Sequence, residues 1–141
     1  MDEKVYEFDV ALSFAGEDRA HAERLANLLR GSHVRVFYDE FVKATLWGKD
    51  LAEHLHNVYS GSARFCVMFI SKHYAAKMWP THERRSAFER ALEEKQEYIL
   101  PARFDDTAIP GLRKTIGYID LGTKSPEQLA ALVLRKLGRQ D

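Results

Sequence analysis

The segment FCVMFI, residues 65–70, is an unbroken run of apolar side chains that is followed at once by Ser71. A short run of this kind is typical of a strand that is buried on both faces. Such strands occur in parallel sheets that helices cover on both sides. A second run, Tyr98–Phe104, is nearly as continuous. The two runs therefore predict the interior of a parallel sheet.

Five short apolar runs alternate with amphipathic helical stretches along the chain, which is the order of an α/β fold. The runs are Phe8–Phe14, Val34–Tyr38, Phe65–Ile70, Tyr98–Phe104 and Ile116–Leu121. Right-handed crossovers through the helices give an open parallel sheet. We therefore predict a flavodoxin-like three-layer sandwich whose five parallel strands have the order 2-1-3-4-5. No repeat or linker divides the chain, so we expect residues 1–141 to form a single domain.

The expected helices carry signals at their ends. Asp18 is placed to cap a helix that ends at Gly31. The sequence DLAE, Asp50–Glu53, has capping-box spacing, and a proline that fits only a first turn begins another helix near Trp79. The sequence SPEQ, Ser125–Gln128, combines a cap, a proline at the first helical position and a glutamine three residues after the cap.

Length and composition describe one ordinary globular domain, with 141 residues, 45% hydrophobic and 30% charged. The 21 basic residues balance 21 acidic ones, so the charge predicts neither nucleic acid nor anionic membrane as a partner. No apolar run approaches the roughly 20 residues that span a bilayer, and the first residues lack the pattern of a signal peptide. We expect a cytoplasmic protein, with its single cysteine, Cys66, in the core.

In an open parallel sheet, ligands bind beyond the carboxyl ends of the strands, where the strand order switches. The segment FAGEDR after the first strand has one glycine, which excludes a dinucleotide-binding G-x-G-x-x-G turn, and the chain has no P-loop motif. Ser71 stands where a phospho-accepting receiver domain would have an aspartate. The histidines are scattered, and His54 and His56 point to different faces of a helix, so we expect no metal site.

Trp79 and Glu83 share one face near the start of an expected helix. The later carboxylates of this helix have an arginine three or four residues away, whereas Glu83 meets only Trp79, Pro80, Ser86 and Ala87. A carboxylate beside apolar surface and without a cation keeps its hydrogen-bonding capacity free for a ligand. The alternative is a first-turn glutamate favoured by the helix dipole, with Trp79 as an anchor at the edge of the core. The spacing alone leaves both interpretations open.

Four segments, taken in order, resemble a Toll/interleukin-1 receptor (TIR) domain of the prokaryotic branch. They are YEFDVALSFAGEDR, VRVFYDEF with a loop that ends in LWGKD, CVMFISKHYAAKMWPTHE, and YILPARFDD. The resemblance covers nearly the whole chain and implies the same flavodoxin-like fold. The loop lacks a proline that many signalling adaptors of this family carry there, which favours the enzymatic branch.

The resemblance implies an NAD+ nucleosidase, which releases nicotinamide together with ADP-ribose or a cyclic isomer, in bacterial antiviral defence or immune signalling. NAD is then the substrate, and no cofactor is implied. The essential glutamate of enzymatic members matches Glu83. Phe14, Ala15 and Gly16 match the segment that lines the substrate cleft. The loop Asp39–Lys49 matches the one that closes over the site or docks on a neighbouring copy or another TIR domain.

The chemistry of NAD cleavage suits these residue types. Nicotinamide leaves from a cationic pyridinium, so no general acid is needed, and the transition state is an oxocarbenium-like sugar. Glu83 would hold the ribose hydroxyls and stabilise the developing cation. Phe14, Trp47 or Trp79 would offer a flat surface to a ring. Ser71 would contact the adenine end of the substrate or, as the alternative, only cap a helix.

Two other function classes stay open at this point. A TIR domain can assemble with copies of itself or with another TIR domain without turnover, and a nucleoside-cleaving transferase also sets a glutamate against a sugar. Trp47 is correspondingly either a substrate or partner contact or a loop anchor packed on the domain's own surface. We expect any further domain to follow Asp141. The residues leave open whether the product is linear or cyclic.

Overall fold

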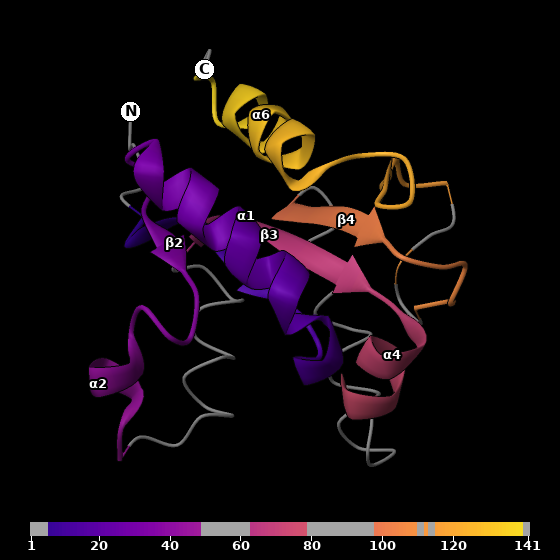
Figure 1. The fold of residues 1–141 in the computed structure, drawn as a ribbon, viewed down its shortest axis with the longest axis horizontal. Coiled ribbons are helices and arrows are strands. Elements are labelled where there is room, and N and C mark those ends of the chain that lie inside the picture. Colours follow the sequence, from indigo (N-terminus) through magenta and orange to yellow (C-terminus); the bar gives the residue numbers. More distant parts are fainter. Residues whose placement is uncertain (1–5, 49–62, 79–97, 110–111, 113–114, 140–141) are drawn as a thin grey trace.

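Five parallel strands form a single sheet in the order β2-β1-β3-β4-β5, and Figure 1 shows β3 and β4 side by side within it. The computed structural model describes residues 6–48, 63–78, 98–109, 112 and 115–139. The strands are β1 (Phe8–Ser13), β2 (Val36–Phe37), β3 (Ala63–Ile70), β4 (Ile99–Arg103) and β5 (Ile119–Asp120). The helices in this part of the chain are the 3-10 turn η1 (Gly16–Asp18), α1 (Arg19–Gly31), α2 (Lys43–Leu46), α4 (Lys72–Met78) and α6 (Pro126–Lys136). The predicted flavodoxin-like strand order is confirmed.

Strand β3 occupies the middle of the sheet, with β1 and β4 parallel to it on either side. Its side chains alternate between two cores, as successive residues of a strand must. Val67 and Phe69 join the core beneath α1 and α6, whereas Cys66, Met68 and Ile70 join the core on the opposite face. All five are buried. The run is apolar because residues 66–70 of β3 are buried whichever face of the sheet they point to.

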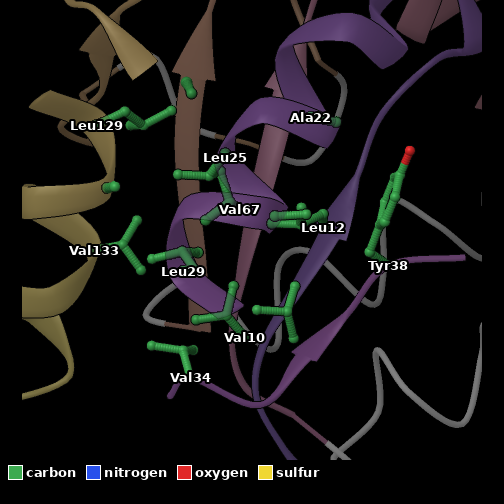
Figure 2. Close-up of a cluster of buried hydrophobic side chains, with 14 of the residues drawn as sticks. Val10, Leu12, Ala22, Leu25, Leu29, Val34, Tyr38, Val67, Leu129 and Val133 are labelled. Atoms are coloured by element: carbon green, nitrogen blue, oxygen red, sulfur yellow. The ribbon is translucent and has the colours of Figure 1, made fainter. Parts of the chain in front are cut away.

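Helices α1 and α6 cover one face of the sheet and pack against each other (Figure 1). Leu25 and Leu29 of α1 lie against the sheet and meet Leu129 and Val133 of α6 in one cluster (Figure 2). Burying a side chain of this size contributes roughly 1.5–3 kcal/mol. The three- and four-residue spacing of these side chains thus places the apolar stripe of each helix on the sheet.

A second core lies on the opposite face of the sheet and includes Cys66, Ile70, Tyr74 and Ile109. Burial raises the pKa of the Cys66 thiol to about 12, so the thiol stays protonated and inert, as expected for a core residue. The helices predicted after residue 50 and near residue 79 lie outside the described residues.

The two edge strands are shorter than the sequence predicts. Strand β2 covers only residues 36–37 instead of 34–38. The amide of Val34 donates to the carbonyl of Leu29 at 3.1 Å and so completes the end of α1 rather than extending the strand. Strand β5 covers residues 119–120 instead of 116–121. Each strand lies at an edge of the sheet, where it has a neighbour on one side alone.

Helices α1 and α6 end in the same hydrogen-bond motif, which requires a left-handed residue two positions after the last helical residue. In α6 that residue is Gly138, with φ 80°, and its amide donates to the carbonyl of Arg135 at 3.0 Å. In α1 it is His33, with φ 62°, and its amide donates to the carbonyl of Arg30 at 3.1 Å. The helix ends at Gly31 as predicted, but a histidine takes the position that favours glycine.

The predicted capping box of α6 is confirmed. The Ser125 hydroxyl accepts a hydrogen bond from the Gln128 amide at 3.1 Å, and the Gln128 side-chain oxygen accepts one from the Ser125 amide at 2.8 Å. Pro126 is the first residue of the helix. Both hydrogen bonds lie within residues 125–128, so the sequence of these four residues is enough to predict the start of α6.

The two helix ends give a matched stability test. His33→Gly removes a Cβ from a left-handed residue, and it should raise the free energy of unfolding by about 0.5–1 kcal/mol after the added entropy of the unfolded chain is counted. Gly138→Ala introduces a Cβ at the equivalent position of α6 and should lower the same quantity by about 1 kcal/mol. Denaturant unfolding measures both. A His33→Gly variant less stable than the parent would contradict the assigned helix end.

Candidate functional site at the carboxyl edge of the sheet

The segments that follow β1, β2, β3 and β4 meet at one edge of the sheet, because parallel strands end on the same side. Arg19 links the segment after β1 to the segment after β2, and Asp18 links it to the segment after β3. The segment after β4 joins them through Asp105, whose carboxylate accepts the amide hydrogen of Lys72 at 3.1 Å. This edge is where the sequence places the candidate site.

Phe14, Ala15 and Gly16, predicted to bind substrate, form the turn after β1 and differ in what they expose. The Phe14 ring is partly buried, and its centre lies 5.8 Å from that of Tyr38. Ala15 is only 1% exposed, so a contact from this residue would come from its backbone. Gly16 is exposed and begins η1. The turn therefore offers a ligand an aromatic ring and an open stretch of backbone.

Ser71 joins the segment after β3 to the turn after β1. Its buried hydroxyl accepts a hydrogen bond from the Tyr74 amide at 3.1 Å and donates one to the Asp18 carboxylate at 2.6 Å. Ser71 therefore caps α4, which is the alternative that the sequence left open beside a substrate contact. The substrate contact itself stays a prediction.

Asp18 does not cap α1, contrary to the prediction. It precedes the helix, but its side chain accepts no hydrogen bond from the first turn. Asp18 ends the turn η1, in which its amide donates to the carbonyl of Ala15 at 2.9 Å. Its carboxylate accepts a hydrogen bond from the Ser71 hydroxyl. A buried hydroxyl needs an acceptor, so a partner 53 residues away takes the place of the local cap.

A second hydrogen bond ties the end of β1 to α4. The hydroxyls of Ser13 and Tyr74 are 2.6 Å apart, and both residues are buried. Leaving one such group unpaired would cost about 1–3 kcal/mol. The sequence analysis missed both residues, because each reads locally as part of an apolar strand or helix face. The bond fixes the backbone from which the Phe14–Gly16 turn starts.

Arg19, the first residue of α1, makes the most extensive polar contacts at this edge among the described residues. Its two terminal nitrogens donate to the two carboxylate oxygens of Asp39 at 2.9 and 2.6 Å, and Nη1 also donates to the Tyr38 hydroxyl at 3.0 Å. The guanidinium carbon lies 5.1 Å from the centre of the Phe14 ring. No local pattern in the sequence predicts this pair, because its members are 20 residues apart.

The Arg19–Asp39 pair stays charged near neutral pH. The hydrogen bond from Arg19 holds the pKa of the Asp39 carboxyl below its ordinary value of 3.8, and the same bond raises the pKa of Arg19. A lowered carboxyl pKa contributes stability above the unfolded value, and that contribution is lost as pH falls through the folded value. The side chains are 38% and 42% exposed, so the pair contributes little to overall stability.

The segment Asp39–Lys49, predicted as a long loop, contains the short helix α2. Trp47 follows α2 directly and is 89% exposed. This exposure argues against the loop-anchor alternative, in which the ring would pack on the domain's own surface. Gly48 has φ 85°, a conformation that favours glycine. Lys49 lies outside the described residues.

Glu83 and Trp79, the predicted catalytic glutamate and its aromatic neighbour, lie outside the described residues. Within the described part of the chain, no three side chains of His, Cys, Asp or Glu gather as metal ligands would. None of the described helices has the length and apolar character needed to cross a membrane.

An apolar hollow of about 830 Å³ lies between α6 and strands β3, β4 and β5. Its walls include Phe65, Leu100, Tyr118 and Leu132. It lies beneath α6, apart from the turns that carry Phe14 and Ser71, and we do not assign it to the candidate site.

The family model for the TIR domain matches residues 10–133. The chain belongs to the TIR domain family. The match runs from β1 into α6 and thus includes every segment at the carboxyl edge. The Phe14–Gly16 turn, the Asp39–Lys49 segment and Ser71 are therefore parts of a TIR domain.

Three curated relatives are similar to this TIR domain. The 3′ cyclic ADP-D-ribose synthase AaTIR of Aquimarina amphilecti is 56% identical over 137 residues, which are 97% of this chain and 42% of that protein. The NAD(+) hydrolase PdTIR of Paracoccus denitrificans is 34% identical over 82 residues, 57% of this chain and 26% of its own length. The NAD(+) hydrolase TcpA of Theionarchaea archaeon is 33% identical over 97 residues, 68% of this chain and 28% of its own length. The TIR domain thus spans less than half of each relative.

Two cap substitutions test the buried network of the TIR domain. Ser71→Ala removes the cap of α4 and leaves the Asp18 carboxylate without its donor, so it should lower the free energy of unfolding by about 1–3 kcal/mol. Ser125→Ala removes only the exposed cap of α6 and should cost about 1 kcal/mol. Chemical denaturation compares the two variants. A Ser71→Ala loss smaller than that of Ser125→Ala would show that the Ser71–Asp18 bond does not stabilise this edge.

Proposed function

We propose that this TIR domain cleaves NAD at the bond between nicotinamide and ribose and releases a cyclic ADP-ribose isomer. The observation that carries the proposal is 56% identity, over 97% of the chain, to a protein named 3′ cyclic ADP-D-ribose synthase. Two further relatives named NAD(+) hydrolases support the same substrate. The enzyme would act in the cytoplasm, in antiviral defence or immune signalling.

The proposed reaction needs little acid–base chemistry from the protein. Nicotinamide departs as a neutral molecule from a pyridinium, so its leaving requires no proton, and positive charge develops on the ribose. A carboxylate beside the ribose stabilises that charge, and Glu83 takes this role in the proposal. A hydroxyl of the substrate then attacks the anomeric carbon in place of water and loses its proton, which closes the ring. Attack by water gives linear ADP-ribose instead.

The carboxyl edge suits the binding of a long, flat-ended substrate. The Phe14 ring is partly exposed beside an open stretch of backbone at Gly16, and a nicotinamide or adenine ring would lie against that ring. Ala15 would contribute through its backbone alone. In the proposal Trp79 forms a second wall next to Glu83, and Ser71 borders the adenine end while it caps α4.

Substitution of the proposed catalytic residue tests the function directly. Glu83→Gln keeps the shape of the side chain and removes its charge, so nicotinamide release from NAD should fall at least about 100-fold. The melting temperature should stay close to that of the parent, because no buried ion pair is expected to break. Chromatography of nicotinamide and of the cyclic product measures the effect.

The outcomes separate the alternatives. Wild-type protein that releases no nicotinamide from NAD, yet binds a second copy or another TIR domain, would favour a non-enzymatic assembly module. Cleavage of nucleosides but not of NAD would favour a nucleoside-cleaving transferase. Near-parental turnover by folded Glu83→Gln would contradict the catalytic role of Glu83, and NAD would remain the proposed substrate.

We also propose that activity depends on self-association through the Asp39–Lys49 segment. Trp47 is 89% exposed, and an exposed tryptophan is a common anchor of protein interfaces. Head-to-tail contacts would place this segment of one copy against the site of the next. Specific activity should therefore rise with protein concentration, and Trp47→Ala should remove that rise without lowering the melting temperature.

Activity and mass must be measured on the same samples, for example by light scattering at each concentration. Tyr118→Ala is a suitable control, because Tyr118 is the other large hydrophobic side chain among the described residues that is mainly exposed. Constant turnover per molecule from monomer to concentrated protein would contradict assembly-dependent activity.

A further inference from the structure

Arg19 contacts two segments at the carboxyl edge, the turn that the proposed function places beside the substrate and the segment that it assigns to self-association. Its paired nitrogens hold the carboxylate of Asp39, the first residue of the Asp39–Lys49 segment. Its guanidinium carbon also lies over the Phe14 ring in the turn after β1, at 5.1 Å from the ring centre. The distance from the Tyr38 ring centre is 5.7 Å, and Nη1 donates to the Tyr38 hydroxyl. The Arg19 side chain therefore bridges the two segments, beside the direct contact between the Phe14 and Tyr38 rings.

The form of these contacts requires arginine. A guanidinium is planar and presents two parallel N–H donors to a carboxylate while its face rests on aromatic rings. A lysine ammonium has the same charge but has neither two parallel donors for a carboxylate nor a flat face to stack on a ring. Because Arg19 and Asp39 are both more than a third exposed, their attraction contributes little to global stability. Their contacts instead restrict where Phe14 and the start of the Asp39–Lys49 segment lie.

The surrounding charges favour this arrangement. Glu40 lies 3.9 Å from Arg19 and also pairs with Lys43 at 3.7 Å, so it adds a second acidic group beside the guanidinium. The Asp39 carboxylate further accepts the Glu40 amide hydrogen at 2.9 Å, which fixes the backbone as it leaves β2. Arg30, three turns along α1, lies over the Phe41 ring at 4.5 Å. Helix α1 thus holds the residues after β2 at two points.

We propose that Arg19 is a positioning residue for NAD, which anchors on Asp39 and Tyr38 and thereby holds the Phe14 ring in the place that the substrate requires. The inference rests on the proposed function. Arg19 is not assigned to the reacting bond, so its loss weakens substrate binding. Loss of Arg19 should raise KM for NAD more than it lowers kcat, because the carboxylate that stabilises the ribose cation is unchanged.

The test compares Arg19→Lys and Asp39→Asn with a control ion pair whose arginine lies on the same helix. Arg24 of α1 pairs with Glu127 of α6 in a more exposed ion pair, so Arg24→Lys and Glu127→Gln are the controls. Arg19→Lys and Asp39→Asn should each raise KM for NAD about tenfold or more with little change in kcat. The double variant should be no worse than either single one, because both break the same contact. The controls should keep the parental KM, and all melting temperatures should agree within about 3 °C.

Amide hydrogen exchange supplies a readout that does not depend on turnover. Arg19→Lys should speed exchange in residues 38–48 and leave residues 63–70 of β3 unchanged, whereas Arg24→Lys should change neither. A parental KM in Arg19→Lys, measured with active protein, would overturn the proposal and leave the proposed function standing. If the wild-type protein releases no nicotinamide, the proposed function fails. In that case unchanged exchange in residues 38–48 would overturn the positioning role as well, and faster exchange would support it.

Discussion

Strand β3 is the element on which the rest of the structure depends, because it is buried on both faces and pairs in parallel with a strand on each side. Parallel pairing forces every connection to return across the sheet, so the segments after β1, β3 and β4 all leave from one edge. Val67 and Phe69 bind the strand to the α1–α6 layer, and Cys66, Met68 and Ile70 bind it to the other core. The position of the candidate site follows from this arrangement, since a ligand at that edge meets residues from several segments at once.

Polar contacts between the segments at the carboxyl edge of the sheet hold these segments in place relative to one another. The buried pair Ser13–Tyr74 and the partly buried pair Ser71–Asp18 tie the end of β1 and the turn η1 to α4. These bonds matter for stability, because an unpaired buried group is costly. The Arg19–Asp39 pair is partly exposed, so its effect is on local geometry. Stability and shape at this edge thus come from different interactions, which can be altered separately.

The parts of the fold that sequence reasoning located are those with local causes. The apolar run of β3 shows its burial on both faces, and the Ser125–Gln128 box satisfies its own amides within four residues. Asp18 has the same local signal as a cap, yet its carboxylate serves Ser71, a partner that only the folded chain brings near. The short β2 has a similar cause, since the Val34 amide completes α1.

The residues of the candidate site differ in the same way, since some have a local signal in the sequence and others have partners only in the folded chain. Ser71 was recognised as a possible cap because the residue that follows a strand and begins a helix is a common cap position. Arg19, Tyr38 and Tyr74 were missed, because nothing in the neighbouring sequence indicates a partner on another segment. Trp47 was noticed as a tryptophan in a polar segment, but only the structure shows that it lies open to solvent.

The central claim, that NAD binds at the carboxyl edge of the sheet, is tested most directly by NMR titration of NAD into the Glu83→Gln protein, which should bind the substrate without consuming it. The amide signals of residues 14–16, 38–41 and 71–74 should shift in a saturable way, because these residues border the proposed cleft. Saturable shifts confined to the hollow beneath α6, at Leu100, Tyr118 and Leu132, with no change at the carboxyl edge, would contradict the account.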